Sequence, residues 1–136
     1  MYTREQSIKR LKQGLENKVF GVYNNAKGCR YYDYSTESCC AVGYLLGDKI
    51  IENAKENRYN IESFTHLLDA NSDEPVEDDI SSQLNAMGRN ELFGLLEVEL
   101  RKLQEYHDRA LQAKRDEEKP EYERNIKLFE KLINEL

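Results

Sequence analysis

Residues 90–136 read NELFGLLEVELRKLQEYHDRALQAKRDEEKPEYERNIKLFEKLINEL, and this segment determines the fold class. Its first half has apolar residues at a spacing close to a heptad pattern, which predicts a helix over 90–114: Leu92, Leu96, Leu100, Leu103 and Ala110. Pro120 interrupts the chain and suits the first turn of another helix. One face of that last helix is apolar: Tyr122, Ile126, Phe129, Ile133 and Leu136. We expect the two helices to form an antiparallel hairpin.

The amino-terminal residues predict a further helix. Thr3 can cap it, and Gln6 can complete a capping box by reaching back to the Thr3 backbone. Apolar residues then follow at helical spacing, and Asn17 suits the end of the helix: Ile8, Leu11 and Leu15.

Residues 18–34 differ in character, because two segments rich in β-forming residues flank a turn-like segment at 24–28. We predict a short β-hairpin there. Residues 35–38 then suit the cap of a helix from Cys39 to about Asn57, in which Gly43 and Gly47 would let another element approach closely.

Residues 61–68 suggest a short helix, residues 69–74 an acidic loop ending at Pro75, and residues 76–87 a further helix. The predicted fold is therefore mainly α (α+β), with about five or six helices, a short β-hairpin near residues 18–34 and a C-terminal helical hairpin. We expect a single domain over 1–136, made of a core (1–89) and the helical hairpin (90–136).

The 136 residues carry a formal net charge of −6, which is unevenly spread. Residues 1–60 hold ten lysines and arginines against seven acids, whereas residues 61–89 hold one arginine against seven acids. The overall acidity argues against general nucleic-acid binding, which relies on a basic surface. The basic first part of the chain leaves room for a small anionic ligand.

Two features predict a cytoplasmic protein without a membrane partner. No apolar segment approaches the ~20 residues that span a bilayer. The first six residues lack the basic-then-apolar pattern of a signal peptide. An odd number of cysteines, with Cys39 and Cys40 adjacent, is also a poor disulfide framework and suits reduced thiols.

A tyrosine-rich segment is the predicted ligand-binding site, since five of the nine tyrosines lie between Tyr23 and Tyr44. Aromatic rings stack on bases, and lysine and arginine hold phosphate. The candidate residues are Tyr23, Lys27, Arg30, Tyr31, Tyr32 and Tyr34. The alternative is that these tyrosines line a strand and cover the core.

Cys39 and Cys40 are the other candidates, because the start of a helix favours a thiolate. A cysteine nucleophile needs a base, and His66 suits that role better than His107, which lies in a long charged helix. Core packing is the favoured alternative, since cysteine is often buried. The spacing of cysteines, histidines and acids predicts no zinc or calcium site, and no nucleotide-fold or hydrolase motif occurs, so we predict no metal and no cofactor.

Two short segments resemble small proteins encoded by tailed bacteriophages. Residues 38–46, SCCAVGYLL, are similar to the CCLGVL segment of those proteins. Residues 80–92, ISSQLNAMGRNEL, are similar to a later L-x-x-L-N-D-x-G-x-S-F segment, but Ala86 replaces the acid and residues 90–92 replace the Ser-Phe pair. The resemblance implies a phage origin and residence in the host-cell cytoplasm, and it implies no particular chemistry.

The first functional hypothesis is thus a non-enzymatic phage-type accessory protein that inhibits a host process, such as antiviral defence. It would bind either a nucleotide-like ligand or a host protein. The alternatives are a cysteine-dependent enzyme and an acidic nucleic-acid mimic that acts on a host DNA-binding protein.

A homodimer through the C-terminal helices is also predicted. A hairpin packed only on itself would leave apolar side chains exposed, which usually marks an interface: Leu95, Val98, Leu111, Leu128 and Leu132. The alternative is that the hairpin folds back over the first helices of the same chain.

Overall fold

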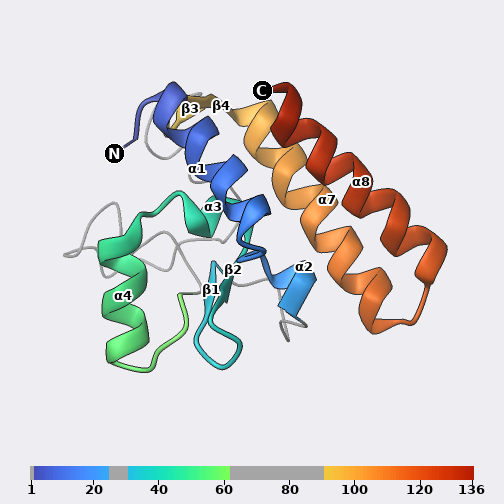
Figure 1. Ribbon diagram of the computed structural model, residues 1–136, viewed down its shortest axis with the longest axis horizontal. Helices are drawn as coiled ribbons and strands as arrows, with labels where there is room; N and C mark the ends of the chain where they lie inside the picture. Colours follow the sequence, from blue (N-terminus) through green and yellow to red (C-terminus); the bar gives the residue numbers. More distant parts are fainter. Residues whose placement is uncertain (1, 25–30, 62–90) are drawn as a thin grey trace, which may run out of the picture.

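A computed structural model describes residues 2–24, 31–61 and 91–136 of the chain. It confirms the predicted class, mainly α with a small β component and a C-terminal helical pair (Figure 1). The helices are α1 (Arg4–Glu16), α2 (Gly21–Asn24), α3 (Ala41–Tyr44), α4 (Asp48–Glu56), α7 (Glu97–Arg115) and α8 (Lys119–Glu135). The strands are β1 (Tyr32–Asp33), β2 (Ser38–Cys39), β3 (Glu91–Leu92) and β4 (Leu95–Leu96). Of the helix predicted over 61–68, only Ile61 is described, and it forms an antiparallel bridge with Tyr32. The rest of that segment, the acidic loop and the helix predicted over 76–87 lie outside the described residues.

Helix α1 has the predicted capping box. The Thr3 hydroxyl accepts a hydrogen bond from the Gln6 N–H (3.3 Å). In return, the side-chain oxygen of Gln6, Oε1, accepts one from the Thr3 N–H (3.0 Å). Asn17 is the C-cap, also as predicted.

The first β-hairpin lies at residues 32–39, so its position differs from the predicted 18–34. Tyr32 pairs with Cys39 and Asp33 with Ser38, in antiparallel register. Residues 35–37, predicted to cap a helix, instead form the turn, in which Asp33 Oδ1 accepts hydrogen bonds from the Ser35 N–H (2.9 Å) and hydroxyl (2.6 Å). Short side-chain acceptors of this kind favour turns.

The helix predicted from Cys39 to about Asn57 is wrong as a continuous element. The chain forms α3, leaves the helical conformation, and resumes as α4 after Gly47. Gly47 has a φ of +100°, which a side chain would disfavour, so this glycine turns the chain between two helices.

The helix predicted to start at Asn90 starts at Glu97 instead. Before it, β3 and β4 form a hairpin whose two turn residues, Phe93 and Gly94, have φ values of 58° and 71°. Positive φ at both positions is typical of two-residue hairpin turns. The Phe93 carbonyl accepts a hydrogen bond from the buried Ser7 hydroxyl (2.7 Å), which holds this hairpin on α1.

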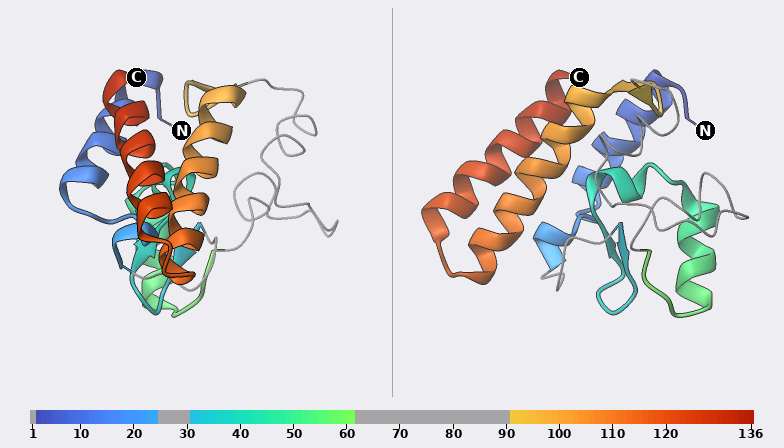
Figure 2. Two further views of the ribbon diagram at one scale, coloured as in Figure 1. Left: turned by 90° about the vertical axis from the view of Figure 1, so that its right-hand side faces the viewer. Right: turned by 180° about the vertical axis from the view of Figure 1, so that it is seen from behind.

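Helices α7 and α8 form the predicted antiparallel pair, and Pro120 lies in the first turn of α8 as expected. The pair packs over α1, α2 and α3 of the same chain (Figure 2). Phe20 lies at the centre of this packing, with ring contacts to Phe129 (5.2 Å between centroids), Tyr44 (5.8 Å) and His107 (6.5 Å). One core therefore draws on both predicted parts of the chain, 1–89 and 90–136.

This packing changes the argument for a dimer. The sequence predicts five partly exposed apolar side chains on the hairpin. Two of them, Leu95 and Leu111, are buried, and Leu132 is half-buried. Only Val98 and Leu128 are exposed. The hairpin covers most of its apolar surface within one chain, which is the alternative that the sequence left open. Self-association stays a prediction.

Candidate functional site

The six predicted ligand-binding residues do not share one surface. Lys27 and Arg30 lie outside the described residues. Tyr31 and Tyr32 are buried, Tyr34 is exposed at the β1–β2 turn, and Tyr23 is half-buried in α2.

Tyr31 and Tyr32 are core residues because backbone contacts hold this segment: Tyr32 in β1 pairs with Cys39 of β2 on one side, and Ile61 contacts both tyrosines on the other. The N–H groups of Tyr31 and Tyr32 donate to the Ile61 carbonyl (2.9 and 3.2 Å), and the Ile61 N–H donates to the Tyr32 carbonyl (3.0 Å). Burial raises the pKa of the Tyr32 phenol, whose oxygen has no hydrogen-bond partner within the described residues. In the structure, both rings take the alternative role of covering the core.

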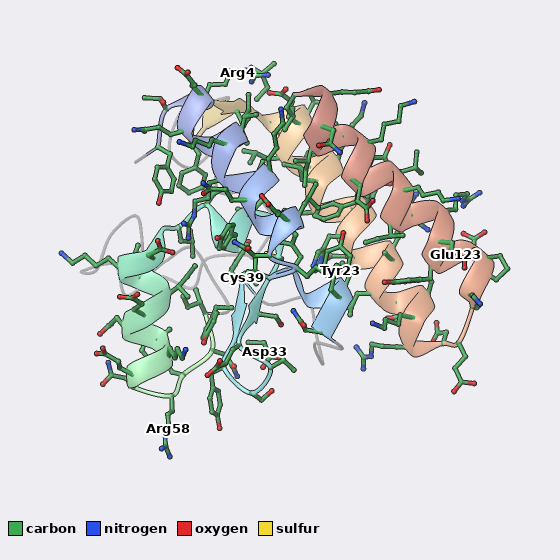
Figure 3. All side chains as sticks on the ribbon, in the orientation of Figure 1. Arg4, Tyr23, Asp33, Cys39, Arg58 and Glu123 are labelled. Carbon is green, nitrogen blue, oxygen red and sulfur yellow. The ribbon has the colours of Figure 1, made fainter. Side chains whose placement is uncertain are left out.

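Tyr23, labelled in Figure 3, lies on α2. Its side chain lines a groove between the end of α1 and the face of α8. The groove has a volume of about 420 Å³, within the range of small-molecule sites. Its lining mixes one aromatic ring with positive, negative and amide groups: Lys12, Leu15, Glu16, Lys18, Tyr23, Glu130 and Asn134. We call it the Tyr23 groove.

Two contacts fix the groups around the Tyr23 ring. The Tyr23 hydroxyl donates a hydrogen bond to Glu130 Oε1 (2.8 Å), although 107 residues separate the two. Lys18 Nζ lies over the ring, 5.9 Å from its centroid, in a cation–π arrangement. Burial, followed by the bond to Glu130, raises the pKa of Tyr23, so the phenol keeps the proton that it donates.

The backbone beneath this groove is also held. Lys18 has a left-handed conformation (φ 52°), and the Asn24 amide donates to the Lys18 carbonyl (2.8 Å) and to the Phe20 carbonyl (3.3 Å). Lys114 Nζ (3.0 Å) and the Tyr122 hydroxyl (3.3 Å) both donate to the Val22 carbonyl. Helix α2, and with it Tyr23, is therefore tied to both C-terminal helices.

Within the described residues, neither Lys12 nor Lys18 has a carboxylate in ion-pair distance. Their ammonium groups are therefore available to a bound anion. Sequence reasoning identified Tyr23 and missed Lys12, Lys18, Glu130 and Asn134. No local signal marks these residues, because only the packing of α8 on α1 brings them together.

The thiols of Cys39 and Cys40 are buried. Burial raises the pKa of Cys39 to about 12 and also raises the pKa of Cys40. Cys40 does lie at a helix start, where its Sγ accepts a hydrogen bond from the Gly43 N–H (3.3 Å), but desolvation outweighs the effect of a four-residue helix. Both thiols are protonated at neutral pH and pack in the core, and Cys29 lies outside the described residues.

Of the two histidines, His66 lies outside the described residues and His107 is in the core. The His107 ring packs against Phe20 and Phe129, and its Nδ1 lies 3.2 Å from Asp108 Oδ1. Its Nε2 is buried without a hydrogen-bond partner in the described part of the chain. The described geometry thus brings no histidine to the surface as a base.

Within residues 2–24, 31–61 and 91–136, no group of three or more histidines, cysteines and acids is arranged to hold a metal ion. None of the helices in these ranges is both long and apolar enough to cross a bilayer.

Comparison of the chain with known protein families, with curated proteins and with solved structures finds no match.

Proposed function

We propose that this chain is a non-enzymatic accessory protein of phage type that binds a nucleotide-like anion in the Tyr23 groove. By holding this ligand, it would withhold it from a host process, such as an antiviral response. The observation that carries the proposal is the Lys18 ammonium over the Tyr23 ring, whose hydroxyl is fixed by Glu130.

The groups in the groove match the parts of a nucleotide. Lys12 and Lys18 can hold a phosphate, since ammonium groups without a carboxylate partner form charge-assisted bonds to it. Tyr23 offers an aromatic wall. The Asn134 amide can both donate to and accept from a base edge, and Glu16 can accept from an exocyclic amine.

The groove also suits binding without large rearrangement. Asn24 holds the backbone that carries Lys18, and Glu130 holds the phenol of Tyr23. Groups that are ordered before the ligand arrives lose less conformational entropy on binding, which favours affinity.

The buried thiols favour this proposal over a cysteine-dependent enzyme. A nucleophilic cysteine is a partly exposed thiolate with a lowered pKa, whereas burial raises the pKa of Cys39 to about 12. The proposal therefore assigns the activity to binding.

Titration calorimetry with adenosine and guanosine monophosphates tests the proposal, with inorganic phosphate and the nucleosides as partial ligands. We expect a monophosphate to bind more tightly than either of its parts. Lys18→Gln should weaken binding by about tenfold or more, because it removes one charge-assisted bond and keeps the side-chain length.

Lys9→Gln is the matched control, since Lys9 is an exposed lysine of α1 outside the groove. It should leave the affinity unchanged. The proposal fails if no monophosphate binds at millimolar concentration, or if both variants weaken binding equally.

A further inference from the structure

The charged side chains that line the Tyr23 groove balance one another. Two are ammonium groups and two are carboxylates: Lys12, Lys18, Glu16 and Glu130. Counted at their formal charges, they give the lining no net charge, while the whole chain carries −6. The groove therefore does not attract an anion through net charge, and a bound phosphate depends on direct contacts with the ammonium groups.

Neither carboxylate is neutralised by a neighbouring group. Glu130 accepts a hydrogen bond from the Tyr23 hydroxyl (2.8 Å), and this donor is uncharged because the phenol keeps its proton. Glu16 is exposed at the end of α1 and forms no ion pair within the described part of the chain. The lining thus keeps four separate charges, two of each sign.

This balance limits the charge that a bound phosphate can carry with advantage. A phosphate with one negative charge already accepts the charge-assisted hydrogen bonds of both ammonium groups. A second charge brings no further donor, and its attraction to the ammonium groups is offset by its repulsion from the carboxylates. Its removal from water still costs free energy, and the net charge of the chain adds repulsion.

We propose that the Tyr23 groove selects a nucleotide whose phosphate is a diester with a single negative charge over a nucleotide monoester. The inference rests on the proposed function, because it requires a nucleotide-like anion in this groove. A phosphate monoester carries roughly two charges above pH 7, since its second ionisation lies near pH 6. In a diester, the second ester bond replaces that ionisable hydroxyl. Cyclic mononucleotides and dinucleoside phosphates share this chemistry.

The test is titration calorimetry at pH 7.5 with adenosine 5′-monophosphate and its methyl ester, which differ by one methyl group and one charge. The methyl ester should bind about threefold more tightly, an effect in the middle of the range for exposed charge pairs. Cyclic 3′,5′-adenosine monophosphate and the dinucleoside phosphate ApA then distinguish the two sources of a diester. Tighter binding of either one than of the monophosphate supports the proposal and identifies the source.

Glu16→Gln tests the cause of this preference. It removes one carboxylate and leaves the lining with one net positive charge, so the second charge of the monophosphate gains attraction. The preference for the methyl ester should therefore disappear. Glu5→Gln is the matched control, because Glu5 is an exposed glutamate in the first turn of the same helix. It lies about 16 Å from Glu16 along the helix axis, beyond the screening length of about 8 Å.

Three results would overturn the proposal. The first is a monophosphate that binds at least as tightly as its methyl ester to the unmodified chain. The second is a preference that Glu5→Gln abolishes as fully as Glu16→Gln does. In both cases, monophosphate binding that depends on Lys18 leaves the proposed function in place. The third is the absence of binding by either ligand at millimolar concentration, which overturns the proposed function as well.

Discussion

Gly43 is the residue on which the backbone just before β1, at Tyr31, packs. A Cβ atom at this position would overlap the carbonyl oxygen of Tyr31, which is backbone and held in place by the pairing of its strand with Ile61. Gly14 is also crowded, but there the added Cβ would lie 2.6 Å from Cζ of the Phe20 ring, a side-chain atom.

These contacts predict unequal costs for the same substitution. Gly43→Ala should destabilise the protein by about 3 kcal/mol, because neither the strand nor α3 can move without disturbing the core. Gly14→Ala should cost about 1 kcal/mol, because overpacking against the buried Phe20 ring costs about 2 kcal/mol and the helix propensity of alanine offsets about 1 kcal/mol of it. Urea denaturation followed by circular dichroism measures both. Equal losses would show that the β1 backbone is not held as described.

At the scale of elements, Arg4 joins the start of α1 to the start of α7. Its guanidinium donates to both carboxylate oxygens of Glu99 (2.7 and 2.8 Å). Glu99 also accepts a hydrogen bond from the Leu96 N–H (2.9 Å) at the N-terminus of α7. The bond from Arg4, with the Leu96 N–H and the Arg4 charge, lowers the pKa of Glu99 below its usual value near 4.5.

This lowered pKa predicts a pH-dependent stability. A carboxyl group whose pKa is lower in the folded than in the unfolded state adds to the free energy of unfolding at pH values above its unfolded-state pKa, here near 4.5. This added stability is lost as the pH falls through the folded-state pKa. Glu99→Gln should cost about 0.5–1 kcal/mol at pH 7, a figure kept low because Arg4 is partly exposed to solvent. The difference from the unmodified chain should therefore shrink as the pH falls below 4.5.

Urea denaturation at pH 7, 5 and 3 checks this prediction. Glu105→Gln is the control, because Glu105 pairs with Arg109 on the exposed face of α7 (2.6 Å). It should cost only about 0.3–0.5 kcal/mol. A Glu99→Gln cost that stays constant over this pH range would contradict the ion pair.

Elements were predictable where their ends are signalled locally. Thr3 and Gln6 mark the start of α1, and Pro120 marks the start of α8, so both helices were found. The prediction of a continuous helix over 39–57 is wrong because Gly47 turns the chain instead of serving as a packing position. Gly94 favours a turn, but the leucines at helical spacing on both sides of it led to the prediction of a continuous helix from Asn90.

The candidate site was less predictable than the fold. Tyr23 was selected for its ring, but its partners Lys18 and Glu130 are recognised only once α8 lies against α1. Tyr31 and Tyr32 have the same residue type as Tyr34, and their burial depends on the contacts that Ile61 and Gly43 make with their strand. Residue type alone does not distinguish these environments.

At the scale of the whole molecule, α8 is an essential part of the core. Phe129 is fully buried against the rings of Phe20 and His107, and Ile133 is also buried. Residues 2–24 therefore depend on a helix about a hundred positions further along the chain. Such long-range packing favours a single cooperative unit.

Phe129→Ala and Leu128→Ala, two neighbouring substitutions in α8, test this cooperativity. Phe129→Ala should cost about 3–5 kcal/mol, because it leaves a cavity that the surrounding rings fill only in part. Leu128→Ala should cost less than about 1 kcal/mol, since Leu128 is 37% exposed. Urea unfolding is followed by far-ultraviolet dichroism, which reports the helices, and by tyrosine near-ultraviolet dichroism. Seven of the nine tyrosines lie outside α7 and α8, so the second signal reports mainly the packing of the rest of the chain. Because Phe129 contacts Phe20 directly, both signals of the Phe129 variant should shift to lower urea together. If the helical signal shifts while the tyrosine signal keeps its midpoint, the C-terminal pair unfolds independently and the shared core is refuted.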